Sequence, residues 1–161
     1  MKIAIGGDHA GFELKQVLIP FIQGLGHKVH DVGNTKFDAA DDYPDFARLV
    51  AVAVARGAVE RGIVVCGSGV GASVVVNKIP GIRGAMCHDT FSARQGVEDD
   101  DANVLSLGGR IIGVSLAQEV VGAFLAAKFS GLERHQRRLE KLKQIELDAR
   151  TGVYDYPEVK E

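Results

Sequence analysis

The sequence predicts an α/β fold in which a five-stranded parallel sheet is covered by helices on both faces and is followed by an extra C-terminal helix. Three observations support this prediction. Short apolar runs alternate along the chain with longer segments of helical periodicity. Each predicted strand is followed by a predicted helix, which is the pattern of parallel sheets. The chain has 161 residues, enough for one domain with a buried core.

The predicted elements follow this alternation from the N-terminus onward. We expect the strands at residues 2–5, 28–32, 62–66, 83–87 and 103–107. We expect helices after them at residues 11–25, 43–56, 69–77, 90–98 and 114–128. No repeat, low-complexity tract or linker interrupts the pattern, so no second domain is needed.

A further helix is expected over residues 131–150, after the last strand. It carries one apolar stripe, made of Leu132, Leu139, Leu142 and Ile145. Such a stripe has to be buried on its own domain or on another copy of the chain, and we favour a homodimer. We therefore expect a single domain over residues 1–150 and a loosely ordered tail over residues 151–161.

Composition excludes several functional classes. A formal net charge of -2 gives no bulk attraction to nucleic acid. The chain has two cysteines, too few for a disulfide framework, which fits a reducing cytoplasmic compartment. No stretch approaches 18 consecutive apolar residues, and the N-terminus turns polar too early for a signal peptide. We expect no membrane association.

Candidate functional residues gather where the strands end. Ligands of open α/β sheets bind outside the carboxyl ends of the strands. Asp8 and His9 follow the first strand, Cys66 ends the third, and Arg110 follows the fifth. Asp8 alone could cap the next helix, and His9 alone could be a surface histidine. Their adjacency in a glycine-flanked turn favours a site.

The pair that follows the fourth strand, His88 and Asp89, is weaker evidence for function. Asp89 stands directly before the expected helix at residues 90–98, where an aspartate commonly caps the helix N-terminus. We expect both residues to be structural.

Cys66 has a position that supplies a mechanism. A thiol between a strand end and a helix start has its thiolate favoured by free backbone N–H groups, which makes it a usable base or nucleophile. The alternative is a buried, inert cysteine. Gly67, Gly69 and Gly71 follow it and expose N–H groups that could hold a phosphate, a carboxylate or an enediolate oxygen.

The same glycines match a competing pattern. Residues 67–72 satisfy the G-x-G-x-x-A form of the dinucleotide fingerprint. The loop follows the third strand rather than the first, a cysteine precedes it, and no room remains for a substrate domain. A nucleotide-binding domain is therefore the weaker alternative. A phosphate-binding loop of the Walker A type is excluded, because no G-K-[ST] ends the loop.

The expected last helix carries an arginine cluster. Arg134 and Arg138 are four residues apart and share one helix face, an arrangement that suits bidentate phosphate binding. The alternative is a solvated face with a Glu133–Arg137 pair. Together with Cys66, the glycine amides and Arg110, these residues suit proton abstraction beside the carbonyl of a phosphorylated sugar. This chemistry needs no metal and no organic cofactor.

The sequence resembles the type B ribose-5-phosphate isomerases, which are related to the galactose-6-phosphate isomerase subunits. Five stretches carry the resemblance in family order: GGDHAGFELK, DDYPDFA, CGSGVGASVVVNKIPGIRGA, NVLSLGGRIIG and RHQRR. The resemblance implies a Rossmann-like three-layer domain that forms a homodimer, often assembled to a tetramer, with active sites at the subunit interface. It implies interconversion of ribose 5-phosphate and ribulose 5-phosphate.

The resemblance also implies roles for single residues. Cys66 would move a proton between C2 and C1, and Ser68 would lie beside the enediolate. The amides from Gly67 to Gly71 would stabilise its charge. Further residues would bind the substrate: Asp8 and Tyr43 would contact the sugar, and His9, Arg110, Arg134 and Arg138 would hold the phosphate.

The match departs from the family pattern at residues 99 and 100. The family usually has a histidine that opens the sugar ring and an asparagine that contacts the sugar, where this chain has Asp99 and Asp100. Asp99 could still donate the proton, its pKa raised by neighbouring carboxylates. Alternatively, the substrate is a four-carbon phosphosugar that cannot close a five-membered ring. An acidic surface loop in a shifted register is a third interpretation.

The function classes that remain open follow from these points. The leading prediction is a ribose-5-phosphate isomerase. The alternatives are an isomerase of a tetrose phosphate such as erythrulose 4-phosphate or of a hexose 6-phosphate, and a catalytically silent homologue that binds phosphosugar.

Overall fold

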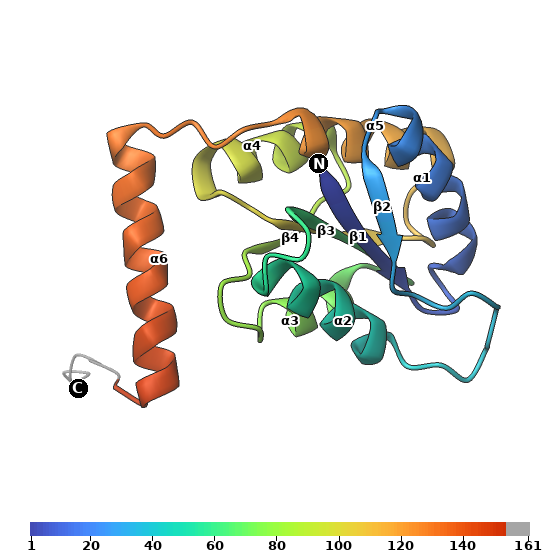
Figure 1. Ribbon diagram of the computed structural model, residues 1–161, viewed down its shortest axis with the longest axis horizontal. Coiled ribbons are helices and arrows are strands. Elements are labelled where there is room, and N and C mark those ends of the chain that lie inside the picture. The colour runs from blue at the N-terminus through green and yellow to red at the C-terminus, as the bar shows by residue number, and fades with distance from the viewer. Residues whose placement is uncertain (154–161) are drawn as a thin grey trace, which may run out of the picture. The chain divides into compact units, whose positions relative to one another are not determined.

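The computed structural model describes residues 1–153 and confirms the predicted fold class (Figure 1). Strands and helices alternate through residue 126. The strands are β1 (Lys2–Gly7), β2 (Lys28–Asp31), β3 (Arg61–Cys66), β4 (Gly84–Met86) and β5 (Val104–Gly108). The helices are α1 (Phe12–Gly24), α2 (Tyr43–Ala55), α3 (Val70–Val76), α4 (Thr90–Asp100), α5 (Val114–Ala126) and α6 (Glu133–Thr151).

The five strands form one parallel sheet in the order β2-β1-β3-β5-β4. From β1 the chain passes to the edge strand β2 and then crosses back to β3 on the other side of β1, so the direction of winding reverses between β1 and β3. Loops that leave the carboxyl ends of these two strands diverge, which opens a crevice at this edge of the sheet. The functional residues predicted after β1, β3 and β5 therefore belong to one edge.

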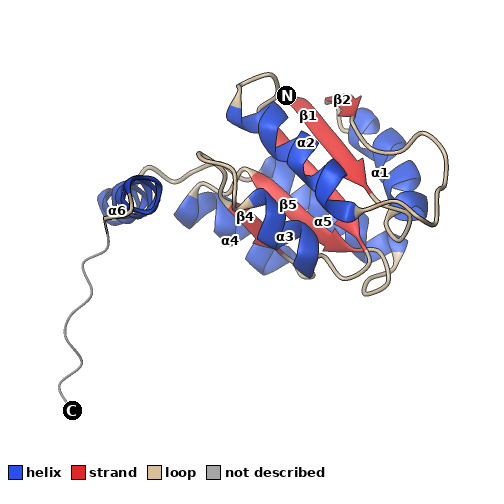
Figure 2. Ribbon diagram, turned by 90° about the horizontal axis from the view of Figure 1, so that it is seen from below, coloured by secondary structure: helices blue, strands red, loops and turns tan. Residues whose placement is uncertain are grey.

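Helices cover both faces of the sheet, which makes three layers (Figure 2). The core between the sheet and α1, α4 and α5 includes Leu18, Val97 and Phe124. The core on the other face, under α2 and α3, includes Val50 and Val76. Strands β3 and β5 are buried almost throughout, which explains why their apolar residues run continuously instead of alternating with polar ones.

One boundary differs from the sequence prediction in a way that matters for function. Helix α4 continues two residues beyond the predicted end at 98, through Asp99 and Asp100, and stops at Asp101. Asp101 adopts a left-handed conformation with φ of 52°, and its carboxylate pairs with Arg83 at 2.6 Å. Asp99 and Asp100 are thus helical and do not belong to a surface loop.

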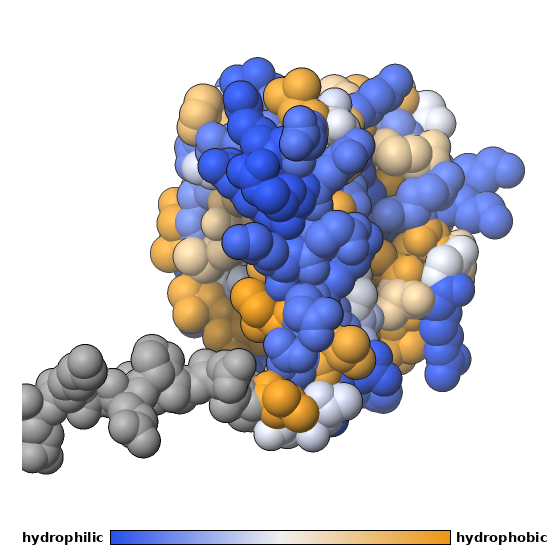
Figure 3. All heavy atoms as spheres, turned by 90° about the vertical axis from the view of Figure 1, so that its left-hand side faces the viewer, coloured by the Kyte–Doolittle hydropathy of each residue, from blue (hydrophilic) through white to orange (hydrophobic). Residues whose placement is uncertain are grey.

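The chain divides into two compact units, of which the first comprises residues 1–129 and the second begins at Ser130. The second unit contains α6, and the face of this helix that Figure 3 shows is mostly hydrophilic. Leu139 of the predicted apolar stripe is buried, whereas Leu132, Leu142 and Ile145 are exposed. The single domain over residues 1–150 stays a prediction. Of the predicted tail, Thr151 is helical and residues 154–161 lie outside the described residues.

No helix within residues 1–153 has both the length and the apolar character needed to cross a lipid bilayer.

Candidate active site

A cavity of about 370 Å³ lies at the carboxyl edge of the sheet. Its walls come from four parts of the chain that are distant in sequence: the β1–α1 turn, the start of α2, the β3–α3 turn and the segment after β5. The lining residues are Asp8, His9, Ala10, Tyr43, Cys66, Gly67, Ser68, Gly71, Arg110 and Ile111. The structure therefore brings together eight of the residues that the sequence singles out.

Cys66 ends β3 and is 4% exposed, with its sulfur held by the turn that follows. The Gly69 N–H donates to Sγ over 3.1 Å. Directly after the neighbouring strand β5, the Gly109 N–H donates to the Cys66 carbonyl over 2.7 Å and fixes the backbone at this point. A donor directed at the sulfur favours negative charge on it, which is the form that accepts a proton.

Gly69 thus has a different partner from the one expected. Its amide contacts the thiol, and Gly69 does not line the cavity. Ser68 is exposed, and its hydroxyl accepts the N–H of Val70 at 3.3 Å. The Gly67 carbonyl accepts the N–H of Arg110 at 3.0 Å, which ties the turn to the segment after β5. Gly67 and Ser68 remain on the cavity wall, where a substrate oxygen can reach them.

Tyr43 begins α2 and reaches the cavity across the start of α3. A Cβ added to Gly71 would lie 2.7 Å from Cζ of the Tyr43 ring. The missing side chain at Gly71 therefore makes the space in which the Tyr43 ring packs. Gly71 therefore contributes to the site by leaving room for the Tyr43 ring.

Asp8 and His9 directly follow β1 and form another part of the cavity wall. Asp8 is 5% exposed, and one carboxylate oxygen accepts the Gly11 N–H at 3.0 Å. This bond closes the turn before α1, whose N-terminus has no side-chain cap, so the capping role considered from the sequence is not found. Asp8 lines the cavity. His9 is half-buried, and the pKa of its imidazole is raised overall, chiefly by its hydrogen bond to Asp41, while the positive charge of Arg110 opposes this rise. His9 and Arg110 are the cationic groups of the cavity wall.

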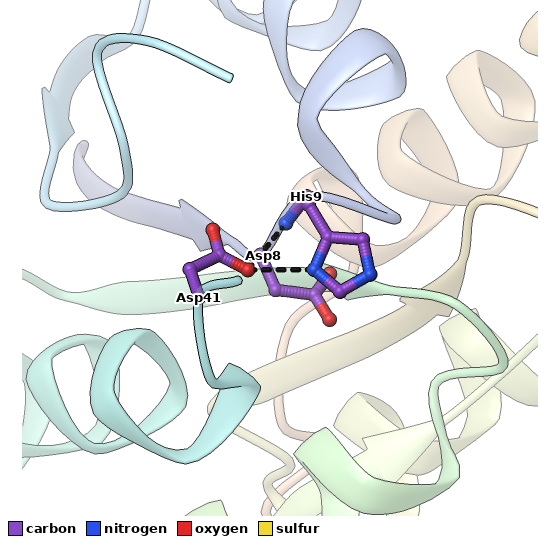
Figure 4. Close-up of side chains that lie close together, drawn as sticks. All are labelled: Asp8, His9 and Asp41. Carbon is purple, nitrogen blue, oxygen red and sulfur yellow. Dashed lines mark hydrogen bonds and ion pairs between the residues drawn. The ribbon is translucent and has the colours of Figure 1, made fainter. Parts of the chain in front are cut away.

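The sequence reasoning missed Asp41. Its carboxylate oxygen Oδ1 accepts both the backbone N–H and the ring Nδ1 of His9, at 2.9 and 2.7 Å (Figure 4). The available signal was an acidic residue two positions before Tyr43, within the DDYPDFA stretch. Asp41 lies 32 residues from His9 in the chain, and no local pattern connects them.

Within residues 1–153, Asp8, His9 and Asp41 form the one cluster of side chains that could hold a metal ion. Each offers one ligand atom, and the three atoms lie within 4.8 Å of one another. His9 Nδ1 and Asp41 Oδ1 are 2.7 Å apart, closer than the roughly 3.3 Å between two ligand atoms on tetrahedral zinc. This geometry is that of a direct hydrogen bond and fits a metal poorly.

Two residues after β4 have structural roles, as expected. The Asp89 carboxylate accepts the N–H of Ser92 at 2.7 Å and caps α4. His88 accepts the Gly108 N–H on Nε2 at 3.0 Å. Asp89 therefore stabilises the start of α4, and His88 links the segment after β4 to the end of β5.

Asp99 and Asp100 are placed away from the cavity of their own chain. Helix α4 starts beside the carboxyl end of β4 and returns to the amino end of β5. Its last turn, which holds both aspartates, is therefore at the opposite edge of the sheet from Cys66. Asp99 and Asp100 do not line the cavity.

Arg134 and Arg138 both lie exposed on α6. Arg134 Nε donates to Nε2 of His135 at 2.9 Å, and His135 Nδ1 is 2.6 Å from the Ser130 hydroxyl. Accepting on Nε2 requires the neutral tautomer of His135 with its proton on Nδ1. His135 is buried and holds the Arg134 guanidinium in one orientation, a role that the sequence did not reveal.

The sequence of this chain is similar to those of a known protein family. Residues 3–142 match the model of the family described as Ribose/Galactose Isomerase. Ribose-5-phosphate isomerase B of Escherichia coli K12 is 43% identical over 145 residues, covering 90% of this chain and 96% of that protein. D-erythrulose-4-phosphate isomerase of Pectobacterium atrosepticum is 42% identical over 131 residues, covering 81% and 86%.

Solved structures agree with these sequence matches. Ribose-5-phosphate isomerase B of Clostridium thermocellum superposes with a TM-score of 0.89 at 44% identity, covering 92% of this chain and 99% of that one. The enzyme of the same name from Mycoplasma genitalium, crystallised with bound ribulose 5-phosphate, has a TM-score of 0.87 at 38% identity, covering 91% and 97%.

Proposed function

Because this chain belongs to the ribose/galactose isomerase family, we propose that it interconverts ribose 5-phosphate and ribulose 5-phosphate with Cys66 as the base. Its class is that of the sugar-phosphate aldose–ketose isomerases. The observation that carries the assignment of the base is the Gly69 N–H on the Cys66 sulfur, in the same cavity as His9 and Arg110.

The reaction proceeds through an enediolate. The Cys66 thiolate removes the proton from C2 of the open-chain aldose, and the electrons of that C–H bond form a C1–C2 double bond while O1 takes negative charge. The thiol then returns its proton to C1, the hydroxyl proton of O2 passes to O1, and O2 becomes the ketose carbonyl. Ser68 and the Gly67 backbone lie on the cavity wall beside Cys66 and stabilise the oxygen that gains charge.

The two ends of the substrate are held by different groups. Asp8 and Tyr43 contact the sugar hydroxyls, and His9 and Arg110 bind the phosphate by charge-assisted hydrogen bonds. Arg134 and Arg138, on α6, add phosphate contacts in the assembled protein. His9 and Arg110 are far from Cys66 in the sequence. They line the same cavity because β1, β3 and β5 end at one edge of the sheet.

A homodimer, with further assembly to a tetramer, completes the proposal. Leu142 and Ile145 on α6 are 43% and 63% exposed, and Val70 and Val74 on α3 are 52% and 56% exposed. Exposed apolar side chains that lie close together on one helix are typical of interaction surfaces. Asp99 and Asp100 lie at the edge of the sheet opposite their own cavity, so a second copy has to supply them to an active site. Light scattering on the purified chain tests this assembly.

A cytoplasmic location suits this mechanism. The proposed base is a free thiol, and Cys87 is also unpaired. A reducing compartment preserves both thiols.

One observation favours a second substrate, a four-carbon phosphosugar. The resemblance to the family pattern puts Asp99 where a ring-opening histidine is expected, and a relative of 42% identity acts on erythrulose 4-phosphate according to its name. A tetrose 4-phosphate has no free hydroxyl with which to close a five-membered ring. Its isomerisation would need no ring-opening acid.

A panel of tetrose, pentose and hexose phosphates distinguishes these substrates. We expect the highest kcat/KM with ribose 5-phosphate, and exchange of the C2 proton when that substrate is incubated in deuterated water. A strong preference for the tetrose would replace the leading substrate by the second. If no phosphosugar showed exchange while one of them bound, the chain would be a catalytically silent binding homologue.

A further inference from the structure

The contact between His9 and Asp41 links the cavity to a loop that the reaction does not otherwise involve. Asp41 lies in the connection between β2 and α2, and its side chain is 6% exposed. Its Oδ1 accepts the backbone N–H and the ring Nδ1 of His9 together (Figure 4). One carboxylate oxygen therefore fixes both the position and the rotation of the imidazole.

We propose that Asp41 is a positioning residue that holds Nδ1 of His9 on the loop side and so presents Nε2–H to the phosphate of the substrate. The proposal rests on the proposed function, in which His9 binds phosphate. An ionised carboxylate only accepts hydrogen bonds, so Nδ1 must carry a proton. Nε2 then carries a second proton only in the imidazolium form. Asp41 thus selects the one form of His9 that brings both a donor and a positive charge to an anion.

A chain of hydrogen bonds fixes the position of the Asp41 carboxylate. The side-chain amide of Asn34 donates to the second oxygen of Asp41, Oδ2. The backbone carbonyl of Asn34 accepts a hydrogen bond at 2.7 Å from Nζ of Lys15. Lys15 is fully buried and pairs with Asp31 at 2.7 Å. An ion pair between the buried Lys15 of α1 and Asp31 at the end of β2 therefore anchors the loop segment that carries Asp41.

Aromatic packing restricts the same ring. Phe37, from the loop that carries Asp41, meets His9 edge-on with ring centroids 6.4 Å apart. Phe37 also meets Phe12, the first residue of α1, at 6.2 Å. The His9 ring is thus held by Asp41 on its polar edge and by Phe37 on another side. Because the ring already has little rotational freedom, little conformational entropy is lost when its N–H binds a ligand.

The charges around His9 act in the same direction as the geometry. The hydrogen bond to Asp41 is the largest cause that raises the pKa of His9 above its ordinary value of 6.5. Asp8 adds to this rise, whereas partial burial and Arg110 lower the pKa. Because the pKa of His9 is raised, the imidazolium persists above pH 6.5 and is lost only as the pH passes the raised value.

The variant Asp41→Asn tests the proposal, because it keeps the size of the side chain and removes the charge. Histidine NMR titration of the full chain measures the pKa of His9, with the His9→Gln variant identifying its signal. We expect the pKa of His9 to fall, because the hydrogen bond to Asp41 is the largest cause that raises it. With ribose 5-phosphate at pH 7.5, we expect KM to rise about tenfold and kcat to change less than about threefold.

Asp38→Asn is the matched control. It removes the same charge from the same loop, where the Asp38 carboxylate accepts the local N–H of Ala40 at 3.0 Å. The Asp38 backbone carbonyl, which accepts the Asp41 N–H, is unchanged by the substitution. Asp38→Asn should leave both the pKa of His9 and the KM unchanged. If Asp41→Asn does not fold, Asp41→Glu takes its place, since the longer carboxylate should weaken the His9 contact and raise KM to a smaller extent.

Inorganic phosphate separates this proposal from the proposed function. Phosphate should shift the His9 signal of the wild-type chain and bind about tenfold more weakly to Asp41→Asn at pH 7.5, whether or not any sugar is isomerised. An unchanged His9 pKa, or a lowered pKa with unchanged phosphate affinity, would overturn the positioning role. Absence of isomerase activity in the wild type would overturn only the function.

Discussion

The backbone N–H of Gly69 donates a hydrogen bond to Sγ of Cys66 over 3.1 Å. Gly69 is the residue before α3 and has a left-handed backbone with a φ of +83°. A dinucleotide fingerprint would assign this glycine to cofactor binding, but here its N–H binds the sulfur of Cys66.

Gly69→Ala should damage both the fold and the thiol. A Cβ would lie 3.1 Å from the Leu107 carbonyl carbon, and the left-handed backbone costs a non-glycine residue about 1–2 kcal/mol. We expect the free energy of unfolding to fall by at least that amount and kcat to fall about tenfold or more. Gly57→Ala is the control, since Gly57 has a φ of +68° and a Cβ there meets no atom within 4 Å. It should lose stability and keep kcat.

Cys66→Ala should abolish most turnover and leave phosphosugar binding intact. Removal of a general base lowers kcat by about 10²–10⁴-fold, and none of the phosphate-binding cations changes. Burial raises the pKa of the other thiol, Cys87, to about 11, so this thiol stays protonated at neutral pH and cannot replace the base. Cys87→Ala should therefore retain kcat. Steady-state kinetics and calorimetry of substrate binding check both variants, and full turnover by Cys66→Ala would remove this residue from its role.

Gly71→Ala should act through Tyr43. The added methyl group would occupy the place of the Tyr43 ring, 2.7 Å from Cζ, so the ring must move out of the cavity wall. We expect kcat/KM to fall about tenfold, an effect of displaced substrate contacts, and the fold to persist. Gly122→Ala, within α5, meets no atom within 4 Å and should raise the free energy of unfolding by about 0.5–1 kcal/mol. Unchanged kinetics in Gly71→Ala would argue against a substrate contact by Tyr43.

Ser106→Ala should stabilise the protein. The Ser106 hydroxyl is fully buried in β5, and its oxygen has no hydrogen-bond partner within the described part of the chain. A buried hydroxyl without a partner costs about 1–3 kcal/mol, so its removal should raise the free energy of unfolding in urea. In the same strand, Leu107→Ala removes packed methyl groups and should lower that free energy by about 2–5 kcal/mol. A destabilised Ser106→Ala would mean that the hydroxyl is satisfied in solution.

Asp99→Asn should discriminate between the two proposed substrates. If Asp99 opens the furanose ring, the variant should lose about 100-fold in kcat/KM with ribose 5-phosphate and little with erythrulose 4-phosphate, which does not form that ring. Glu98→Gln, in the same helical turn, should have little effect on either substrate. An equal loss on both substrates would assign Asp99 to binding or structure instead of ring opening.

Much of the cavity could be predicted from the sequence because parallel strands end at a common edge. Once the alternation of strands and helices is recognised, Asp8, Cys66 and Arg110 have to meet, although 58 and 44 residues separate them in turn. The same alternation implies that a helix such as α4 returns to the opposite edge, which places Asp99 away from the cavity of its own chain.

The sequence by itself therefore determined the layers, the parallel sheet and the edge at which the functional side chains gather, since these follow from periodicity and from the geometry of strand–helix units. Only the tertiary structure decided which polar groups meet there. Asp41 reaches His9 through a loop held by buried Lys15, and the Gly69 amide turns toward Cys66. Such contacts depend on how an aperiodic loop and a single left-handed residue pack against the finished sheet, and no repeating pattern in the sequence records them.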